Sequence, residues 1–135
     1  MGRQRTTHVI FTAANSTGSG NQMKMGGMVY PGIEVSLNRF IGRIVFKASR
    51  RRTAVSDWSA ANSSSNGLFP VSLINEEDSA NVVQGDAGLS YTATESSVRG
   101  YGVSMNQVVA FNAVIASISN GTVSINAFST RLRSN

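Results

Sequence analysis

Apolar and polar residues alternate along much of this chain, which is the pattern of half-buried strands. The alternation is clearest in two segments, "IEVSL" (33–37) and "RFIGRIVFKA" (39–48). Side chains on a strand point alternately to its two faces, so a period of two is expected there. Shorter stretches with strand composition lie at 7–13, 68–74, 89–94 and 99–104. No run longer than about ten residues keeps a clean helical period, so the sequence predicts an all-β protein.

The strongest strand signal lies near the C-terminal end. Two long runs, 107–119 and 121–132, flank the pair Asn120-Gly121. Asn-Gly is the preferred pair in a two-residue type I′ turn, because both central residues need a positive φ. The first run is apolar on both faces, as in a central strand, and the second run alternates. The sequence therefore predicts that the two runs pair with each other as an antiparallel hairpin.

These runs amount to about eight strands in a chain of 135 residues, the length of one domain. We therefore expect a single-domain β-sandwich or barrel over residues 1–135, and the strand count permits a jelly roll. Residues at about 1–6 should form a flexible N-terminal segment. The Gly-, Ser- and Asn-rich stretch at about 15–27 should be a mobile loop or arm, as should 59–66, because neither has a pattern that could pack.

The strand expected at 39–48 has two unlike faces. The apolar face, which should point to the core, carries Phe40, Ile44, Phe46 and Ala48. The opposite face carries two cations, Arg43 and Lys47, together with Ile41 and Val45. The strand is therefore expected to be amphipathic, with a half-cationic outer face.

Charged residues are few and unevenly placed. They make up 14% of the chain, whereas soluble domains usually carry about 25%. A monomer with so little charge must coat itself with Ser, Thr, Asn and Gly, and a large buried interface is the other explanation. The formal charge is +5, with the excess of cations in the first half of the chain and an excess of acids in the second. This composition favours an oligomer or a lattice.

A basic run is the main candidate contact site. Lys47, Arg50, Arg51 and Arg52 fall within six positions, and Arg3 and Arg5 near the N-terminus carry further positive charge. Such cations could neutralise phosphates of a nucleic acid. They could equally face an acidic patch on another protein, and we weigh a protein-facing or solvated role ahead of nucleic acid. Trp58, which follows the run, could stack on a base, but a core position is favoured because the chain has few aromatic residues.

The matching acidic cluster is Glu76, Glu77 and Asp78. Carboxylates bind hard cations, but this cluster lacks the spaced pattern of a calcium loop, and a solvated turn is the simpler interpretation. Two opposite clusters of three charges on one subunit would also suit a head-to-tail contact between copies. The acidic cluster is therefore expected to be the assembly partner of the basic run.

The residues that catalysis needs are sparse. The chain has one histidine, His8, and no cysteine, so it has neither a His-rich nor a thiolate metal site. We therefore expect no enzyme activity, no metal and no cofactor. No segment approaches the roughly 18 consecutive apolar residues of a membrane-spanning helix, so no membrane span is expected.

The chain resembles small virion structural proteins, namely jelly-roll coat proteins and vertex or decoration proteins. The likeness consists of a basic start ("MGRQR"), an all-β body rich in Ser, Asn, Gly and Thr, the lack of Cys, and the closing segment "VVAFNAVIASISNGTVSINAFSTRL". It implies a structural subunit of a virus particle, located in the virion, with copies of itself and other virion proteins as partners. A soluble β-barrel that binds nucleic acid through the basic loop is the alternative. A carbohydrate-binding sandwich would want more exposed aromatic residues.

Overall fold

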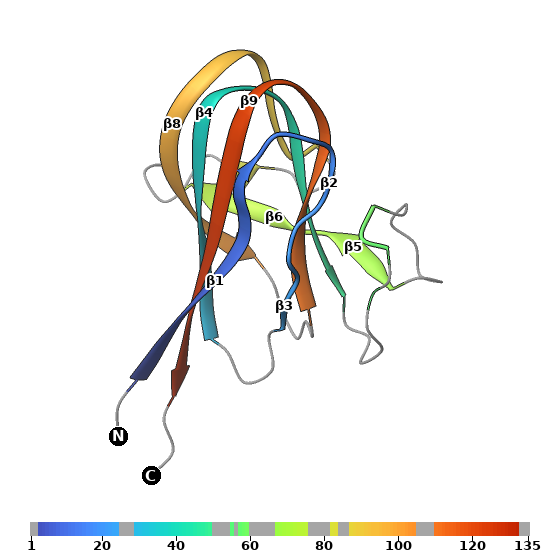
Figure 1. Ribbon diagram of the computed structural model, residues 1–135. Helices are drawn as coiled ribbons and strands as arrows, with labels where there is room; N and C mark the ends of the chain where they lie inside the picture. The colour runs from blue at the N-terminus through green and yellow to red at the C-terminus, as the bar shows by residue number, and fades with distance from the viewer. Residues whose placement is uncertain are drawn as a thin grey trace.

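The computed structural model describes residues 3–24, 29–49, 55, 57–59, 67–75, 82–83, 87–104 and 110–132. These residues contain no helix and form one antiparallel sheet of nine strands (Figure 1). The strands are β1 (Arg3–Ala14), β2 (Gly18–Ser19), β3 (Met23–Lys24), β4 (Val29–Ser49), β5 (Leu68–Pro70), β6 (Ser72–Asn75), β7 (Val82–Val83), β8 (Leu89–Ser104) and β9 (Ala110–Leu132). The expectation of an all-β fold is confirmed, and the finer assignment to a jelly roll stays a prediction.

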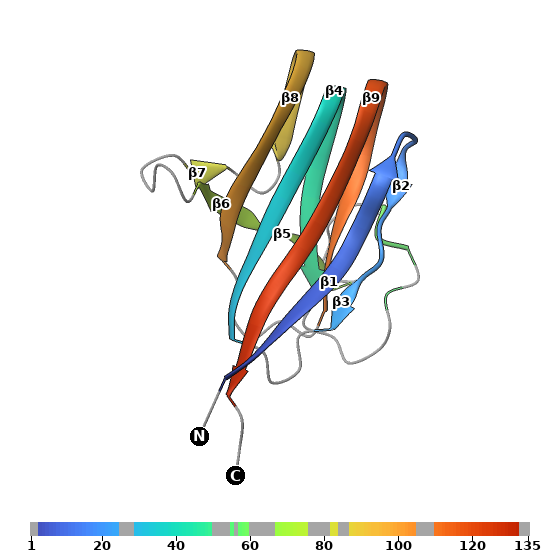
Figure 2. The same cartoon turned by 60° about the vertical axis from the view of Figure 1, so that its left-hand side comes forward.

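The sheet is folded over itself. Strands β4, β8 and β9 each run to one end of the molecule, bend there and return, so that they form nested arches (Figures 1 and 2). One set of arms, called layer A, holds the first half of β4 and the second halves of β8 and β9, flanked by β1 and β6. The other set, layer B, holds the remaining halves, flanked by β2, β3 and β5. A single sheet therefore supplies both layers of the sandwich.

The prediction of a hairpin about Asn120-Gly121 is wrong. Residues on both sides of Gly121 belong to one strand, β9, and they pair along β4 instead of with each other. Asn38 lies opposite Thr122 in layer A, and Ile41 lies opposite Asn120 at the start of layer B. Gly121 does have a positive φ of 78°, but the bend of an arch uses that conformation as well as a hairpin turn does. A local preference for positive φ could not distinguish the two.

Polar side chains satisfy the backbone at the bends, where the strand register shifts. Arg39 adopts a φ of 53° at the bend of β4. Its amide donates to Ser96 Oγ on β8 at 3.0 Å, and its carbonyl accepts a hydrogen bond from Asn120 Nδ2 on β9, also at 3.0 Å. Side chains of β8 and β9 thus bond the backbone of β4 at the point where a bulge interrupts the pairing between the strands.

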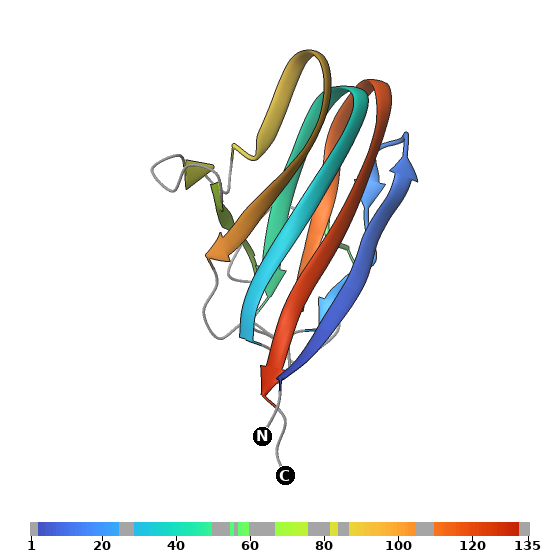
Figure 3. The ribbon, with the colours of Figure 1, turned by 90° about the vertical axis from the view of Figure 1, so that its left-hand side faces the viewer.

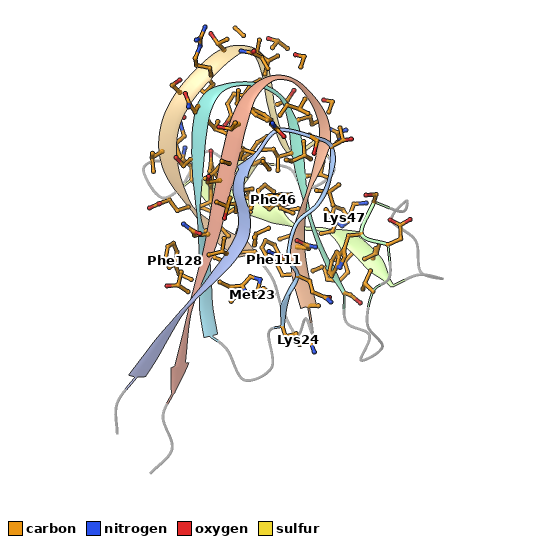
Figure 4. All side chains as sticks on the ribbon, in the orientation of Figure 1. Met23, Lys24, Phe46, Lys47, Phe111 and Phe128 are labelled. Carbon is orange, nitrogen blue, oxygen red and sulfur yellow. The ribbon has the colours of Figure 1, made fainter. Side chains whose placement is uncertain are left out.

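The main core fills the space between the layers. Its largest fully buried side chains include Phe40, Phe46 and Phe111. Phe46 stacks on Phe111 with ring centroids 6.1 Å apart, and Phe40 meets Tyr91 edge to face at the same distance. Figure 4 shows Phe46, Phe111 and Met23 between the arms of the arches. The four residues assigned to the apolar face of segment 39–48 are all buried in this cluster, as expected.

The segment expected to be a loop or arm at about 15–27 lies along β9 over its described part, 15–24. Its two short strands, β2 and β3, pair with β9, and Met23 is 2% exposed within the core. The buried Asn112 donates through Nδ2 to the Gly20 carbonyl at 2.8 Å. Likewise, the residues expected to form a flexible N-terminal segment lie, from Arg3 onward, in β1. Sequence composition did not reveal these contacts because they are made by single side chains and by the backbone.

Strands β5 and β6 cross the open end of the sandwich, opposite the bends. β5 pairs with β4 in layer B and β6 pairs with β8 in layer A. Between them lies Val71, which is buried and donates its amide to the Phe46 carbonyl at 2.9 Å. Segment 68–75 therefore joins the two layers at the end where the arches do not.

Replacing Gly121 by Ala should lower the free energy of unfolding by at least about 2 kcal/mol. A Cβ there would overlap the carbonyl oxygens of Arg39 and Asn38, and positive φ alone costs an L-residue about 1–2 kcal/mol. The matched control is Gly102→Ala, because a Cβ at Gly102 meets only the Ile74 carbonyl oxygen, at 3.9 Å. Urea unfolding measures both. Equal, small effects of the two changes would contradict the role given to Gly121.

Replacing Asn112 by Ala should loosen segment 18–24 selectively. The change leaves the Gly20 carbonyl without its donor and should cost about 1–3 kcal/mol, as for other buried groups that lose a partner. Hydrogen exchange should accelerate more at the amides of Gly20 and Asn21 than at Ile125 in layer A. Uniform acceleration across the sheet would show that Asn112 has no local role.

Candidate assembly surfaces

Lys47 of the basic run lies in the layer B half of β4. Its neighbours across the sheet are Asn112 on β9 and Pro70 on β5. It points away from the main core, as the alternation indicated, and Figure 4 shows it on the side opposite Phe128. However, Lys47 is only 8% exposed, so the expectation of a solvent-facing cation at this position is wrong.

A second apolar cluster covers Lys47 and its surroundings. The cluster consists of Val45, Trp58, Leu68, Ala110 and Val114, with Val55 packed against it. Trp58 is 5% exposed, which confirms its expected core position and leaves its ring no open face for a base. The turn that carries it is held by Asp57, whose Oδ1 accepts a hydrogen bond from the Ser59 amide at 3.0 Å. Layer B is thus buried on both faces near its open end.

Burial lowers the pKa of the Lys47 ammonium, and the nearby carboxylate of Asp57 partly opposes this shift. Desolvation disfavours the charged form of a lysine, whereas an opposite charge favours it. The two effects identify Lys47 as a cation held inside the fold. It is therefore a poor candidate for a contact with phosphates.

The other predicted contact residues are only partly placed. Arg3 and Arg5 lie in β1, where their backbones face Leu132 and Thr130 of β9. Arg50, Arg51 and Arg52 lie outside the described residues, as do Glu76, Glu77 and Asp78. The contact between the basic run and the acidic cluster of another copy stays a prediction.

The outer surface of layer A, which we call face A, carries the exposed large hydrophobic side chains of the described chain. Among the described residues, the large hydrophobic side chains that are exposed are Val9 at 45%, Ile74 at 38% and Val98 at 60%. The register places all three on this face: Val9 beside Asn126 and Glu34, Val98 beside Ser36 and Ser124, and Ile74 beside Gly102, Gly32 and Phe128. Figure 3 shows layer A from this side. Its described side chains include one ionised group, the exposed Glu34.

The outer surface of layer B, which we call face B, has the opposite character. Where the Trp58 cluster does not cover it, face B carries Lys24, which is exposed, and Arg43, whose Nε donates to the Ala87 carbonyl at 2.8 Å. Ser117 on β9 and Ser90 on β8 flank Arg43. Outside the Trp58 cluster face B is therefore polar, with Lys24 and Arg43 on either side of that cluster, whereas face A combines polar side chains with three exposed apolar ones and one acid.

The sequence did not predict the exposed apolar residues of face A, because alternation does not say which outward-facing positions another segment will cover. Val9 stands in the expected strand 7–13, and Val98 lies between the expected strands 89–94 and 99–104. Only the arch geometry shows that their side of β1 and β8 has nothing packed on it in the described chain.

Titratable groups in the described part of the chain do not gather into a metal site. They include no group of three His, Cys, Asp or Glu residues that could hold an ion. Burial raises the pKa of Tyr91, and so do the charge of Tyr101 and the side-chain hydrogen bond with it. This phenol therefore stays protonated at neutral pH. A search of the described residues for a helix long and apolar enough to cross a membrane found none.

The buried charge of Lys47 predicts a pH dependence. Because its pKa is lower in the folded than in the unfolded state, unfolding takes up a proton between the lowered pKa and the ordinary value of 10.5. The contribution of Lys47 to the free energy of unfolding should therefore increase as the pH rises through that window. Relative to Lys47→Met, wild type should gain stability between pH 7 and 10.5 in urea unfolding, with Lys24→Met as the control at an exposed position. A difference that stays constant with pH would contradict the burial of the charge.

Comparison with known proteins identifies the fold. No protein-family model matches the chain, and no curated protein matches it. Among solved structures it is similar to the crystal structure of the SPBc2 prophage-derived protein YomS, with a TM-score of 0.65 and 14% sequence identity. The superposition covers 96% of each chain. At this identity the likeness shows a shared fold, so the arched sheet is also the fold of a prophage-derived protein.

Proposed function

We propose that the chain is a structural subunit of a phage particle that assembles from copies of itself. The observation that carries the proposal is that the exposed large hydrophobic residues of the described chain, Val9, Ile74 and Val98, all lie on face A, where the described side chains include one ionised group. An outer face with several exposed apolar side chains and few charges is typical of a surface that another protein covers. The low charge content of the whole chain, 14%, supports the same conclusion.

The phage assignment is supported by the likeness to a prophage-derived protein over nearly the whole of both chains. Within this class, the resemblance to coat, vertex or decoration proteins favours a place in the virion shell, with other virion proteins as further partners. The basic start of the chain and the run Arg50, Arg51 and Arg52 leave the packaged genome as a second partner of the same subunit.

Two of the residues that the alternative, a soluble nucleic-acid-binding β-barrel, would use as contacts are not exposed. It used Lys47 as a phosphate contact and Trp58 as a stacking platform, and both side chains are buried, Trp58 within the second cluster. Stacking and phosphate contacts require exposed side chains. The assembly role therefore has more support than the nucleic-acid role.

Light scattering of the purified chain at low and high salt tests the proposal. We expect a large symmetric assembly that persists at high salt, because apolar contacts resist the screening that weakens surface ion pairs. A monomer at both salt concentrations would contradict it. If that monomer also retarded an oligonucleotide in a gel, the alternative function would replace it.

A further inference from the structure

The first and last strands of the chain continue together as a two-stranded ribbon. Arg3–Thr6 of β1 pair with Ser129–Leu132 of β9, and we call these two segments the terminal ribbon. The first pair between β4 and β9 is Val29 with Thr130, so the last two residues of β9 pair with β1 alone in the described chain. Figures 1 and 3 show both strands running past the start of β4 toward the chain ends. The terminal ribbon therefore extends beyond the other strands of layer A.

The register brings three arginines from opposite ends of the sequence together in this ribbon. Arg131 lies opposite Gln4, and therefore between the partners of Arg3 and Arg5. A strand rises about 3.3 Å per residue, and the Cβ atoms of directly paired residues lie about 5 Å apart. The three arginine positions are thus neighbours, although the sequence alone linked only Arg3 with Arg5.

The strands of the terminal ribbon contain no acid that would offset these charges. Neither β1 nor β9 includes Asp or Glu. The acid of the neighbouring β4 is Glu34, which pairs with Asn126. Asn126 is five positions from Arg131 on β9, or about 17 Å at the rise of a strand. That distance is about twice the Debye length at physiological ionic strength, so Glu34 does not neutralise the ribbon.

The composition of the terminal ribbon suits a phosphate backbone better than a protein surface. Apart from Leu132, each of its residues is Arg, Gln, Thr or Ser, and these are types that donate hydrogen bonds to phosphates and sugars in protein–DNA complexes. Protein interfaces instead place apolar and aromatic residues at their centre. A two-stranded β-ribbon also has a width that the major groove of DNA admits.

We propose that the terminal ribbon binds the phosphate backbone of nucleic acid through Arg3, Arg5 and Arg131. The contact is made to charge and not to bases, so it is independent of base sequence and weakens steeply as salt is added. The proposal deepens the proposed function and rests on it only for the identity of the nucleic acid, the packaged genome. Binding itself requires the folded subunit and no assembly. An acidic surface on another protein is the competing occupant.

The first test removes the three charges together. Arg3→Gln with Arg5→Gln and Arg131→Gln should weaken binding to a mixed-sequence DNA duplex of about 20 base pairs by about tenfold or more at low salt. The slope of log K against log salt should become shallower by up to about 2.7, because each phosphate contact contributes about 0.9 in B-DNA.

The matched control removes the same net charge at exposed positions elsewhere. The change to Gln is made at three described cations outside the ribbon, Lys24, Arg39 and Arg99. This control should keep a salt slope close to that of wild type, because its cations are not the ones in contact with phosphates. Circular dichroism and urea unfolding show whether each variant is folded.

The second test depends on the register of the ribbon. Gln4→Glu puts a carboxylate opposite Arg131 and between Arg3 and Arg5 in the chain. It should weaken binding to the same duplex several-fold more than Ala93→Glu, which adds the same charge at an exposed position in the bend of β8.

The outcomes separate this proposal from the proposed function. If the ribbon variants bind the duplex as their controls do, or if wild type does not bind it at low salt, the proposal is overturned, and light scattering still decides the assembly role. If the ribbon variants lose assembly but keep their affinity for DNA, an acidic protein surface occupies the ribbon and the proposal is again overturned. If wild type is a monomer whose DNA binding depends on the ribbon, the proposal stands and the structural role falls.

Discussion

The bend shared by the long strands is the constraint on which the rest of this structure depends. Three neighbouring strands must turn at the same level, and each turn breaks the regular ladder of backbone hydrogen bonds. Arg39 shows how the break is repaired, since its amide and carbonyl are taken by Ser96 on one side and Asn120 on the other. At the edge, Ala13, with a φ of 45°, donates its amide to Ser124 Oγ at 2.9 Å. These small polar side chains supply hydrogen-bond partners to backbone groups that the interrupted ladder leaves without one, and so stabilise the bends.

Folding one sheet over itself makes the two layers unequal. Leu68 of β5 and the turn around Trp58 lie against the outer side of layer B, where they pack with Val45 in a second cluster beside Lys47. Layer A receives no such cover in the described chain, so Val98 and Val9 remain exposed. The asymmetry follows from connectivity, because the segments that follow β4 begin at the end of a layer B arm. It explains why part of face B is covered by the protein itself, whereas face A has no such cover in the described chain.

The candidate contact residues show where sequence reasoning reached its limit. The pattern correctly put Lys47 on the side of β4 away from Phe46, but side and exposure are different properties. A residue on the outer face of a strand becomes buried when a distant segment packs over that face, as Trp58 and Leu68 do beside Lys47. Val98 is the converse case, an apolar residue in a strand over which no described segment packs. Neither outcome is encoded in the residues next to them, because both depend on which loops cross which layer.

The local sequence determined the all-β class, the apolar face of segment 39–48 and the conformational demand at Gly121. These properties arise from neighbouring residues alone: alternation selects a strand, and Asn-Gly tolerates positive φ. The tertiary structure decided how that conformation is used. Pairing β9 along the whole of β4 joins the two runs beside Asn120 into one arch, and it offers many more backbone hydrogen bonds and a shared core than a separate hairpin would. A turn preference is local and worth little energy, whereas strand partners are chosen by the burial that the whole sheet achieves.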